Sequence, residues 1–437
     1  MTLPPSVQCR TVADPAALHV AVDAVVGDAR VAALGENNHG IRQFGVLREQ
    51  LVRFLVRERG FGVVALESGF AEGALVDAWV QGGDASWEDV ARDGFTFRAG
   101  DHPETAALVA GLREHRAAGG VVRFAGLDVP GSGGSPAPAL RRLRAELPAE
   151  LASGVTAEVA FGPAAEPAAG PAAGQTAELA AGLAAGPAAW LTEAVDRALA
   201  ATAPYAAANN GVAPGRWSAL DAATQDAATT ALARLLLRVE ALGEGHDVAR
   251  HLVRGALRLD EQLREFAVLF AGDPPARVVS SRDVHMAETV RLLLAEHPDR
   301  RIVLLLHNGH AQRVPFAFLP GVAAPSAGTF LAAELGDDYA VLGITALAGT
   351  TTGLALDDSA RHGIALSTGP LPDPAPDSVE RAVLDAGLGA EPVLLDLRAA
   401  RGDTGPASIR HATTHTAVDV AAGYDAVICL PEQGTSL

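Results

Sequence analysis

The sequence predicts an α/β fold, with a mostly parallel central sheet flanked by helices and a helical insertion that forms a lid over the carboxyl edge of the sheet. Three observations predict it. Short apolar runs typical of buried strands recur along the chain, each followed by a polar or acidic residue. Amphipathic segments of helical spacing lie between the first runs. Residues 137–270 are rich in Ala, Leu, Arg and Glu with almost no β-branched runs, which favours helices there.

The first strand is expected at residues 31–34, where an apolar run ends at Gly35 and a polar turn follows. Apolar residues then recur at helical spacing as far as Arg59, so a helix follows the turn. The next apolar run, residues 61–67, ends on Glu67. The β-α-β spacing of these two runs predicts that they are parallel neighbours in the sheet.

Later segments repeat this pattern. After a helical stretch near residues 104–116, the run 121–128 ends on a carboxylate, and the run 301–307 ends on a histidine. The α/β pattern resumes with a run at residues 276–283, before a helix at 284–294. The last strands are expected near residues 336–345, 392–397 and 424–430. Because parallel strands end at the same edge of a sheet, open α/β folds gather their polar groups there.

The chain has 437 residues, which is more than a domain with a single hydrophobic core usually contains. An insertion or a second domain is therefore expected. We assign residues 1–136 and 271–437 to the α/β core and residues 137–270 to the helical insertion. Within the insertion, residues 154–187 form a tract rich in Ala, Gly and Pro that lacks large apolar side chains. Such a tract cannot build a core, so we expect a loop.

The composition limits the partners and the cellular location. A net charge of -18 argues against nucleic acid and anionic membrane surfaces as partners. No apolar run reaches the roughly 18 to 20 residues needed to cross a bilayer, and the first residues do not resemble a signal peptide. The two cysteines, Cys9 and Cys429, cannot build a disulfide framework. These features predict a protein of the reducing cytoplasm.

The sequence contains no lysine, which removes several classes of chemistry. Schiff-base catalysis, pyridoxal phosphate and the Walker-type phosphate loop all need a lysine. No Gly-x-Ser-x-Gly motif is present, so a serine hydrolase of the usual α/β type is not expected. The remaining catalytic groups are histidines, carboxylates, arginines and water.

The candidate site is a set of polar side chains that follow predicted strand ends, together with one arginine on the first helix: Glu36, His39, Arg48, Glu67, Asp128, Asp283, His307 and His310. In a single parallel sheet these groups would converge on one cleft. A neutral imidazole can take a proton from water, while a carboxylate fixes its tautomer. A second histidine or an arginine can stabilise an oxyanion or protonate a leaving oxygen. The set therefore suits hydrolysis by an activated water.

Each member also has an ordinary structural explanation. Glu36 could cap the following helix, Arg48 could form a surface ion pair, and the histidines at 307 and 310 could belong to a polar turn. A divalent metal bound by His39, Glu67 and His307 is a further alternative. However, His-Asn-Gly-His is not a recognised helical ligand pair, so we expect no cofactor. Repetition of the pattern at several strand ends favours a shared catalytic site.

The sequence resembles the erythromycin esterase family, and within it the type II macrolide esterases. Five groups of motifs carry the resemblance in the family's order over most of the chain: Gly35–His39 with Arg48, Ala65–Gly73, Gly126–Pro130 with Gly133–Ser135, Arg282–Asp283 with Met286–Glu288 and His307–His310, and Gly336–Tyr339 with Leu342–Thr345. Several separate motifs in the right order are more specific than one short motif.

The resemblance implies an α/β core with a helical domain over it. It also implies hydrolysis of a macrolide lactone without a covalent enzyme intermediate and without a required metal. By position, His39 would be the general base that activates water. Glu36 and Glu67 would orient His39 and the water, and Arg48 would hold the carboxylates in place.

The resemblance also assigns the far side of the site. His307 and His310 would bind the carbonyl side of the ester or assist the leaving alkoxide. We further expect Asp128, Asp283 and Phe70 to contact the substrate. The expected partner is a small-molecule substrate, a macrolide or a polyketide.

Three functions remain open from the sequence. The first is a macrolide esterase, which would confer antibiotic resistance. The second is a tailoring enzyme of the same family in secondary-metabolite biosynthesis, such as a dehydratase, cyclase or lyase acting on a polyketide or peptide. The third is a catalytically inactive binding protein, against which the intact Glu36, His39, Glu67 and His307 argue. The sequence pattern does not indicate an oligomeric state.

Overall fold

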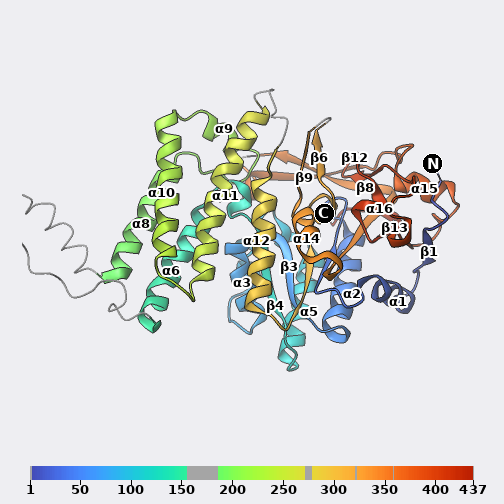
Figure 1. Cartoon of the computed structure of the whole chain (residues 1–437), viewed down its shortest axis with the longest axis horizontal. Coiled ribbons are helices and arrows are strands. Elements are labelled where there is room, and N and C mark those ends of the chain that lie inside the picture. Colours follow the sequence, from blue (N-terminus) through green and yellow to red (C-terminus); the bar gives the residue numbers. More distant parts are fainter. Residues whose placement is uncertain (1, 155–185, 271–277, 320–321, 358, 437) are drawn as a thin grey trace, which may run out of the picture.

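The computed structural model describes residues 2–154, 186–270, 278–319, 322–357 and 359–436. It confirms the predicted α/β fold, with a mostly parallel central sheet and flanking helices (Figure 1). The tract expected to be a loop, residues 154–187, lies outside the described residues except at its two ends.

The described residues include a nine-stranded central sheet. Its strands, in spatial order, are β1 (Gln8–Thr11), β10 (Val393–Asp396), β13 (Ala426–Gln433), β8 (Tyr339–Leu356), β2 (Val31–Leu34), β5 (Arg301–Leu305), β3 (Phe61–Gly69) and β4 (Arg123–Asp128), with β9 (Ile364–Pro370) paired to the far part of β8. The strands from β13 to β4 are parallel to one another. β10 is antiparallel to β13, and β1 is antiparallel to β10.

β2 and β3 are parallel but not neighbours, which corrects the prediction from their β-α-β spacing. β5 lies between them, and Leu34, Leu305 and Leu66 share one register across the three strands. The chain that leaves β5 therefore emerges between the turn after β2 and the end of β3. A short connection does not fix strand order, because a later strand can be inserted between two early ones.

Helices cover both faces of the sheet and give the core two apolar layers. The first layer lies against α1 (Pro15–Val26), α2 (Arg42–Glu58), α3 (Phe70–Val80) and α5 (Pro103–Ala117), and the second against α12 (Ser281–Glu296), α14 (Ala327–Leu335), α15 (Val379–Asp385) and α16 (Val420–Gly423). Along β2, Ala32 and Leu34 face the first layer, whereas Val31 and Ala33 face the second. Burial on both faces explains why the strands are continuous apolar runs.

The helical insertion forms a bundle beside the β4 side of the sheet (Figure 1). Its described helices are α6 (Ala137–Gly154), α8 (Gly186–Thr202), α9 (Ala213–Ser218), α10 (Ala222–Glu240) and α11 (Asp247–Phe270). The bundle has its own apolar cluster, which includes Phe70 from α3. The C-terminal half of α11 reaches the carboxyl edge, where Gln262 and Glu265 line a cavity together with Arg282 and His310.

The prediction of a strand at residues 276–283 is wrong for residues 278–283, which the structure describes. Residues 278–280 are irregular, and α12 begins at Ser281, with the Ser280 side chain accepting the Asp283 N–H as a helix cap. Asp283 therefore lies in the first turn of a helix rather than at a strand end. Elements not predicted from the sequence include α4 (Trp87–Asp93) and the hairpins β6–β7 (Phe316–Leu319, Val322–Ala324) and β11–β12 (Ser408–His411, Thr414–Ala417).

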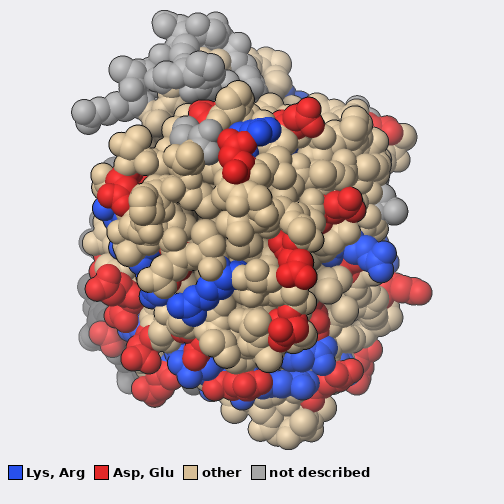
Figure 2. Space-filling model, turned by 90° about the vertical axis from the view of Figure 1, so that its right-hand side faces the viewer, with Lys and Arg blue, Asp and Glu red and all other residues tan. Residues whose placement is uncertain are grey.

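The surface on the side away from the bundle carries both signs of charge. Figure 2 shows that acidic and basic side chains are interspersed there and gather mainly toward the lower rim of the view. None of the described helices combines the length and the apolar character that crossing a bilayer requires.

Candidate active site

The turn after β2 carries the first group of charged side chains. Gly35 follows the strand and packs closely against Asn308. A Cβ atom added at Gly35 would lie 2.1 Å from Asn308 Oδ1, so a larger residue does not fit here. The Oε1 of Glu36 accepts hydrogen bonds from His39 Nδ1 at 2.8 Å and from Arg48 Nη1 at 2.6 Å. Arg48 lies on α2, so the helix after the turn anchors the carboxylate that orients the histidine.

The end of β5 enters between this turn and β3. His307 precedes the short helix α13 (Asn308–Ala311), and its backbone N–H donates to Glu67 Oε2 at 2.6 Å. The His307 Nδ1 accepts the Gly309 N–H at 3.0 Å, which leaves Nε2 as the donor to Asn37 O at 2.8 Å. Both ring nitrogens of His307 are therefore occupied by the main chain. The ring joins the turn after β2 to the helix after β5.

Glu67, at the end of β3, is the meeting point of the cluster. A register shift interrupts β3 here, as is common beside functional sites. The Glu67 Oε1 lies 2.8 Å from Arg282 Nη2, 3.6 Å from His39 Nε2 and 3.5 Å from His310 Nε2. The Nε2 atoms of two histidines from separate strand ends thus converge on one carboxylate oxygen.

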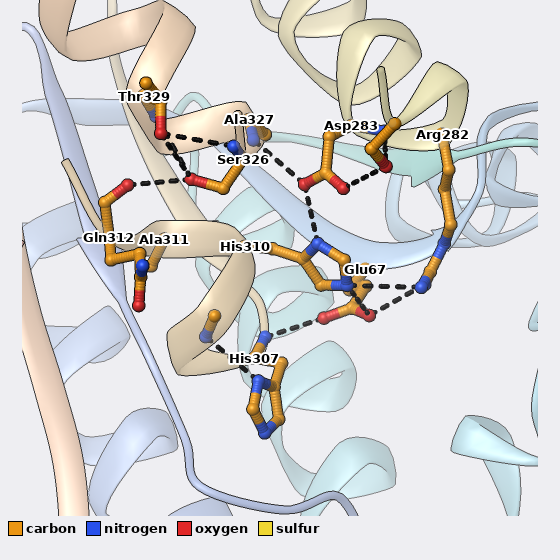
Figure 3. Close-up of polar contacts among 12 residues, drawn as sticks. Glu67, Arg282, Asp283, His307, His310, Ala311, Gln312, Ser326, Ala327 and Thr329 are labelled. Carbon is orange, nitrogen blue, oxygen red and sulfur yellow. Dashed lines mark hydrogen bonds and ion pairs between the residues drawn. The ribbon is translucent and has the colours of Figure 1, made fainter. Parts of the chain in front are cut away.

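Figure 3 shows the second half of the cluster, in which His310 lies between two carboxylates. The His310 Nδ1 donates to Asp283 Oδ1 at 2.6 Å. Asp283 is itself held by the Ala327 N–H at 2.9 Å and by the Ser280 hydroxyl at 2.5 Å. These bonds fix the ring of His310 with its Nε2 directed toward Glu67 (Figure 3).

Arg282, beside Asp283 on α12, links two buried carboxylates. Its Nε lies 2.9 Å from Asp128 Oδ1 and its Nη2 lies 2.6 Å from Asp128 Oδ2, at the end of β4. Asp128 is completely buried. The guanidinium carbon also lies 5.7 Å from the ring centroid of Phe97. Asp128 therefore holds Arg282, and Arg282 in turn holds Glu67.

The carboxylates favour the protonated form of His39. Burial alone would lower its pKa, but Glu67 and Glu36 raise the pKa of His39 to about 10. Because 52% of the His39 side chain is exposed, water screens part of this attraction. Burial would raise the pKa of Glu36, yet Arg48 and His39 lower it. Burial also opposes ionisation of Glu67, but His310 and His39 hold its pKa well below the usual range.

The other two histidines of the cluster differ in charge. Burial would lower the pKa of His310, but Asp283 and Glu67 raise it, although Arg282 Nη1 lies 3.1 Å from Nε2 and opposes protonation. Burial and the neighbouring His411 hold the pKa of His307 well below its usual value. The cluster therefore contains two histidines that favour the cationic form and, between them, a neutral one.

Among the described residues, no group of three or more His, Cys, Asp or Glu side chains is arranged to hold a metal ion. In the set considered from the sequence, His39, Glu67 and His307, the nitrogens of His307 are directed at Asn37 and Gly309 instead of a shared position.

The structure brings the eight residues of the predicted polar set into one cluster: Glu36, His39, Arg48, Glu67, Asp128, Asp283, His307 and His310. The three residues expected to contact the substrate are all buried against other parts of the protein, and that expectation stays a prediction. Asp128 and Asp283 are enclosed by their protein partners, with 0% and 1% exposure. Phe70 packs in the core of the bundle, with its ring centroid 4.6 Å from that of His251.

Two residues of the cluster were not predicted as site residues. Arg282 lies within a quoted motif, but a lone arginine gives no sequence signal of the carboxylates that it pairs. His411 lies on the β11–β12 hairpin, with its ring centroid 4.3 Å from that of His307. An isolated histidine in a short polar strand carries no periodic pattern that would point to a site.

A groove runs between the core and the bundle next to this cluster. Its volume is about 630 Å³, and its walls include Ser132, Pro138 and Leu199. Thr96 also lines the groove, whereas the next residue, Phe97, covers Arg282. A single loop therefore separates the groove from the charged cluster.

A family model described as erythromycin esterase matches residues 56–433, which is most of the chain. The chain belongs to the erythromycin esterase family. The family predicted from the motifs is thus confirmed. Glu36, His39 and Arg48 precede the matched range.

Members of the family from Escherichia coli match most of the chain. Erythromycin esterase type II is 25% identical over 375 residues, covering 83% of this chain and 80% of its own. Erythromycin esterase type I is 23% identical over 422 residues, covering 94% of this chain and 92% of its own. The solved structure of the erythromycin esterase EreC, a histidine-to-asparagine mutant in its open conformation, has a TM-score of 0.76 over 98% of each chain. At 20% sequence identity, this structural match shows a shared fold.

Proposed function

We propose that this protein is a carboxylic ester hydrolase that opens the lactone of a macrolide with a water activated by His39. The convergence of the His39 and His310 Nε2 atoms on Glu67 Oε1, at 3.6 and 3.5 Å, carries the proposal. A base and an acid that face one small space can serve the two proton transfers of ester hydrolysis. Membership of the erythromycin esterase family supports the ester substrate.

In the proposed reaction, His39 is the general base. Glu36 holds its Nδ1, and the 3.6 Å between Nε2 and Glu67 Oε1 exceeds a direct hydrogen bond. In the proposal, the attacking water lies to one side of these two atoms and donates a hydrogen bond to each. In its unprotonated form, His39 takes a proton from this water as the water oxygen bonds to the carbonyl carbon. Because the carboxylates raise the pKa of His39, the reactive form increases with pH.

His310 is the general acid of the proposal. Its raised pKa keeps a proton available, and Asp283 fixes the ring through Nδ1. When the tetrahedral intermediate collapses, the leaving alkoxide takes this proton. Glu36 and Glu67 do not act as nucleophiles, because each is engaged by an arginine and a histidine. No covalent enzyme intermediate is then required.

The remaining members position these groups. Arg48 holds Glu36, and Asp128 holds Arg282 against Glu67. His307 acts through its backbone N–H on Glu67 and through its ring on the turn after β2. The groove between the core and the bundle, at about 630 Å³, falls within the range of about 300 to 1,000 Å³ that ligand pockets span, and it is the space proposed for the body of the macrolide.

The test is incubation with erythromycin and other large-ring lactones, followed by mass spectrometry. Lactone hydrolysis adds one water to the mass, and His39→Ala should abolish the gain. In a single turnover in heavy-oxygen water, the label should appear in the product carboxylate and not in Glu36 or Glu67. Loss of water, or a product of unchanged mass, would instead identify a dehydratase, cyclase or lyase.

A further inference from the structure

The β11–β12 hairpin is fastened to the turn that holds the proposed base. The Ala412 N–H donates to Asn37 O at 2.8 Å, and the same carbonyl oxygen accepts the His307 Nε2–H at 2.8 Å. Asn37 follows Glu36 directly and precedes His39 by two residues. The tip of the hairpin is therefore held at the catalytic turn, although it comes from the C-terminal part of the chain.

Alternation along β11 gives two neighbouring residues opposite surroundings. Arg410 is completely buried, its N–H donates to Glu380 Oε1 at 3.0 Å, and its Nε donates to Ala346 O at 3.3 Å. His411 instead lies against the site, with its ring centroid 4.3 Å from that of His307 and 5.5 Å from that of Phe316. The buried arginine anchors the hairpin, and the hairpin holds the histidine in place.

The two ring nitrogens of His411 are not equivalent. Nδ1 is buried without a hydrogen-bond partner, whereas Nε2 is not enclosed and bonds to none of the described residues. Buried donors without acceptors are rarer than buried acceptors without donors. The tautomer with the proton on Nε2 is therefore favoured. It places the ring N–H on the side of His411 that the protein does not enclose. Burial, with the nearby charges of His310 and His39, lowers the pKa of His411 to about 4, so the ring is neutral.

His307 is the centre around which the other histidines lie. Its ring centroid is 5.9 Å from that of His39, 6.4 Å from that of His310 and 4.3 Å from that of His411. The ring nitrogens of His307 are both used by the main chain. Of the two neutral histidine rings in the cluster, His307 and His411, only His411 has a ring N–H that is not bonded to a described residue.

We propose that His411 is a catalytic residue whose Nε2–H donates a hydrogen bond to the carbonyl oxygen of the ester. This proposal rests on the esterase function proposed above. As water adds, its oxygen bonds to the carbonyl carbon, its proton passes to His39, and the carbonyl electron pair moves onto the oxygen held by His411. On collapse, the alkoxide leaves with a proton from His310. His411 keeps its own proton throughout, because it acts only as a donor.

The experiment compares His411→Phe with His411→Asn, using erythromycin or another lactone that the wild-type protein opens. The phenylalanine keeps a ring against His307 but has no N–H, so kcat should fall by roughly 10²- to 10³-fold, as for one oxyanion donor. KM should change by less than about threefold, because the bond strengthens mainly in the transition state. The asparagine retains an amide donor and should recover part of kcat.

Three further readouts separate this role from a structural one. Both limbs of the pH–rate profile should stay in place, because His411 is neutral over the working range. The midpoint of thermal unfolding should remain that of the wild type. His297→Phe, at the end of α12 away from the site, makes the same chemical change and should leave kcat unaltered.

Two results would overturn the proposal while leaving the esterase function intact. One is a His411→Phe variant with near-normal kcat beside an inactive His39→Ala variant. The other is an equal loss in the phenylalanine and asparagine variants together with a lower unfolding temperature. If the wild-type protein opens no lactone, the esterase function fails first and takes this proposal with it.

Discussion

Replacing Glu36 by glutamine should move the pH dependence of the reaction without dismantling the site. The Glu36 Oε1 accepts from both His39 Nδ1 and Arg48 Nη1, and a glutamine amide oxygen can accept the same two bonds. Glu36→Gln therefore removes a negative charge and keeps the geometry. Arg48 then has no negative charge to pair with and remains near His39. Its positive charge further disfavours protonation of the His39 ring.

The size of the shift follows from the distances. Two unit charges about 4 Å apart near a protein surface interact by about 4 kcal/mol at an effective dielectric constant of about 20. The His39 ring is 52% exposed, so solvent screening reduces the attraction. We expect about one third of the attraction to remain, or about 1.3 kcal/mol. Because one pKa unit corresponds to about 1.36 kcal/mol, the pKa of His39 should fall by about one unit.

The sign of the effect is set by the raised pKa. Glu67 and Glu36 raise the pKa of His39 to about 10, so the free base increases as pH rises toward that value. In Glu36→Gln the pKa falls, and the acid limb of kcat/KM should move to lower pH by about one unit.

The assay is kcat/KM for lactone opening, followed by mass spectrometry between about pH 5 and about pH 10 and corrected for uncatalysed hydrolysis. Glu49→Gln is the matched control, since Glu49 pairs with Arg53 on the same helix. It makes the same charge change and should leave the limb in place. An acid limb that stays put in Glu36→Gln would refute the assignment of His39 as the titrating base.

Three other substitutions test the acid, the buried ion pair and a buried histidine. His310→Asn should lower kcat by roughly 10²- to 10⁴-fold for a lactone, and much less for an activated aryl ester whose leaving group needs no proton; an equal loss on both substrates would contradict the acid role. Arg282→Met leaves Glu67 and the completely buried Asp128 without their shared arginine and should cost about 3 to 5 kcal/mol in urea unfolding, and adding Asp128→Leu should recover the part due to Asp128; no recovery would argue against a charge effect. Burial lowers the pKa of His285 from 6.5 to about 4, so the unfolded chain binds more protons in that range and stability falls as pH drops through it. His285→Leu should remove about 2 kcal/mol of this acid-side loss, measured as the difference in unfolding free energy between about pH 7.5 and about pH 5, and an unchanged difference would exclude this histidine as its source.

The motifs predicted most members of the site because each lies in a short segment with a local signal. Glu36 and His39 share one turn, Glu67 ends an apolar run, and His307 and His310 share another turn. The predicted roles were less complete. The sequence could not show that both nitrogens of His307 are occupied by the main chain, or that Phe70 packs in the bundle. Contacts of this kind depend on which segments meet in space.

The sequence by itself determined the local elements of this protein, because apolar periodicity, turn residues and strand-end motifs depend on neighbours along the chain. The tertiary structure decided the strand order, in which β5 enters between β2 and β3 and brings His307 and His310 beside His39 and Glu67. It also decided that Arg282 lies between two carboxylates and that the β11–β12 hairpin reaches the catalytic turn. These arrangements join segments far apart in the sequence, and they arise from burying two faces of one sheet together, which no single segment encodes.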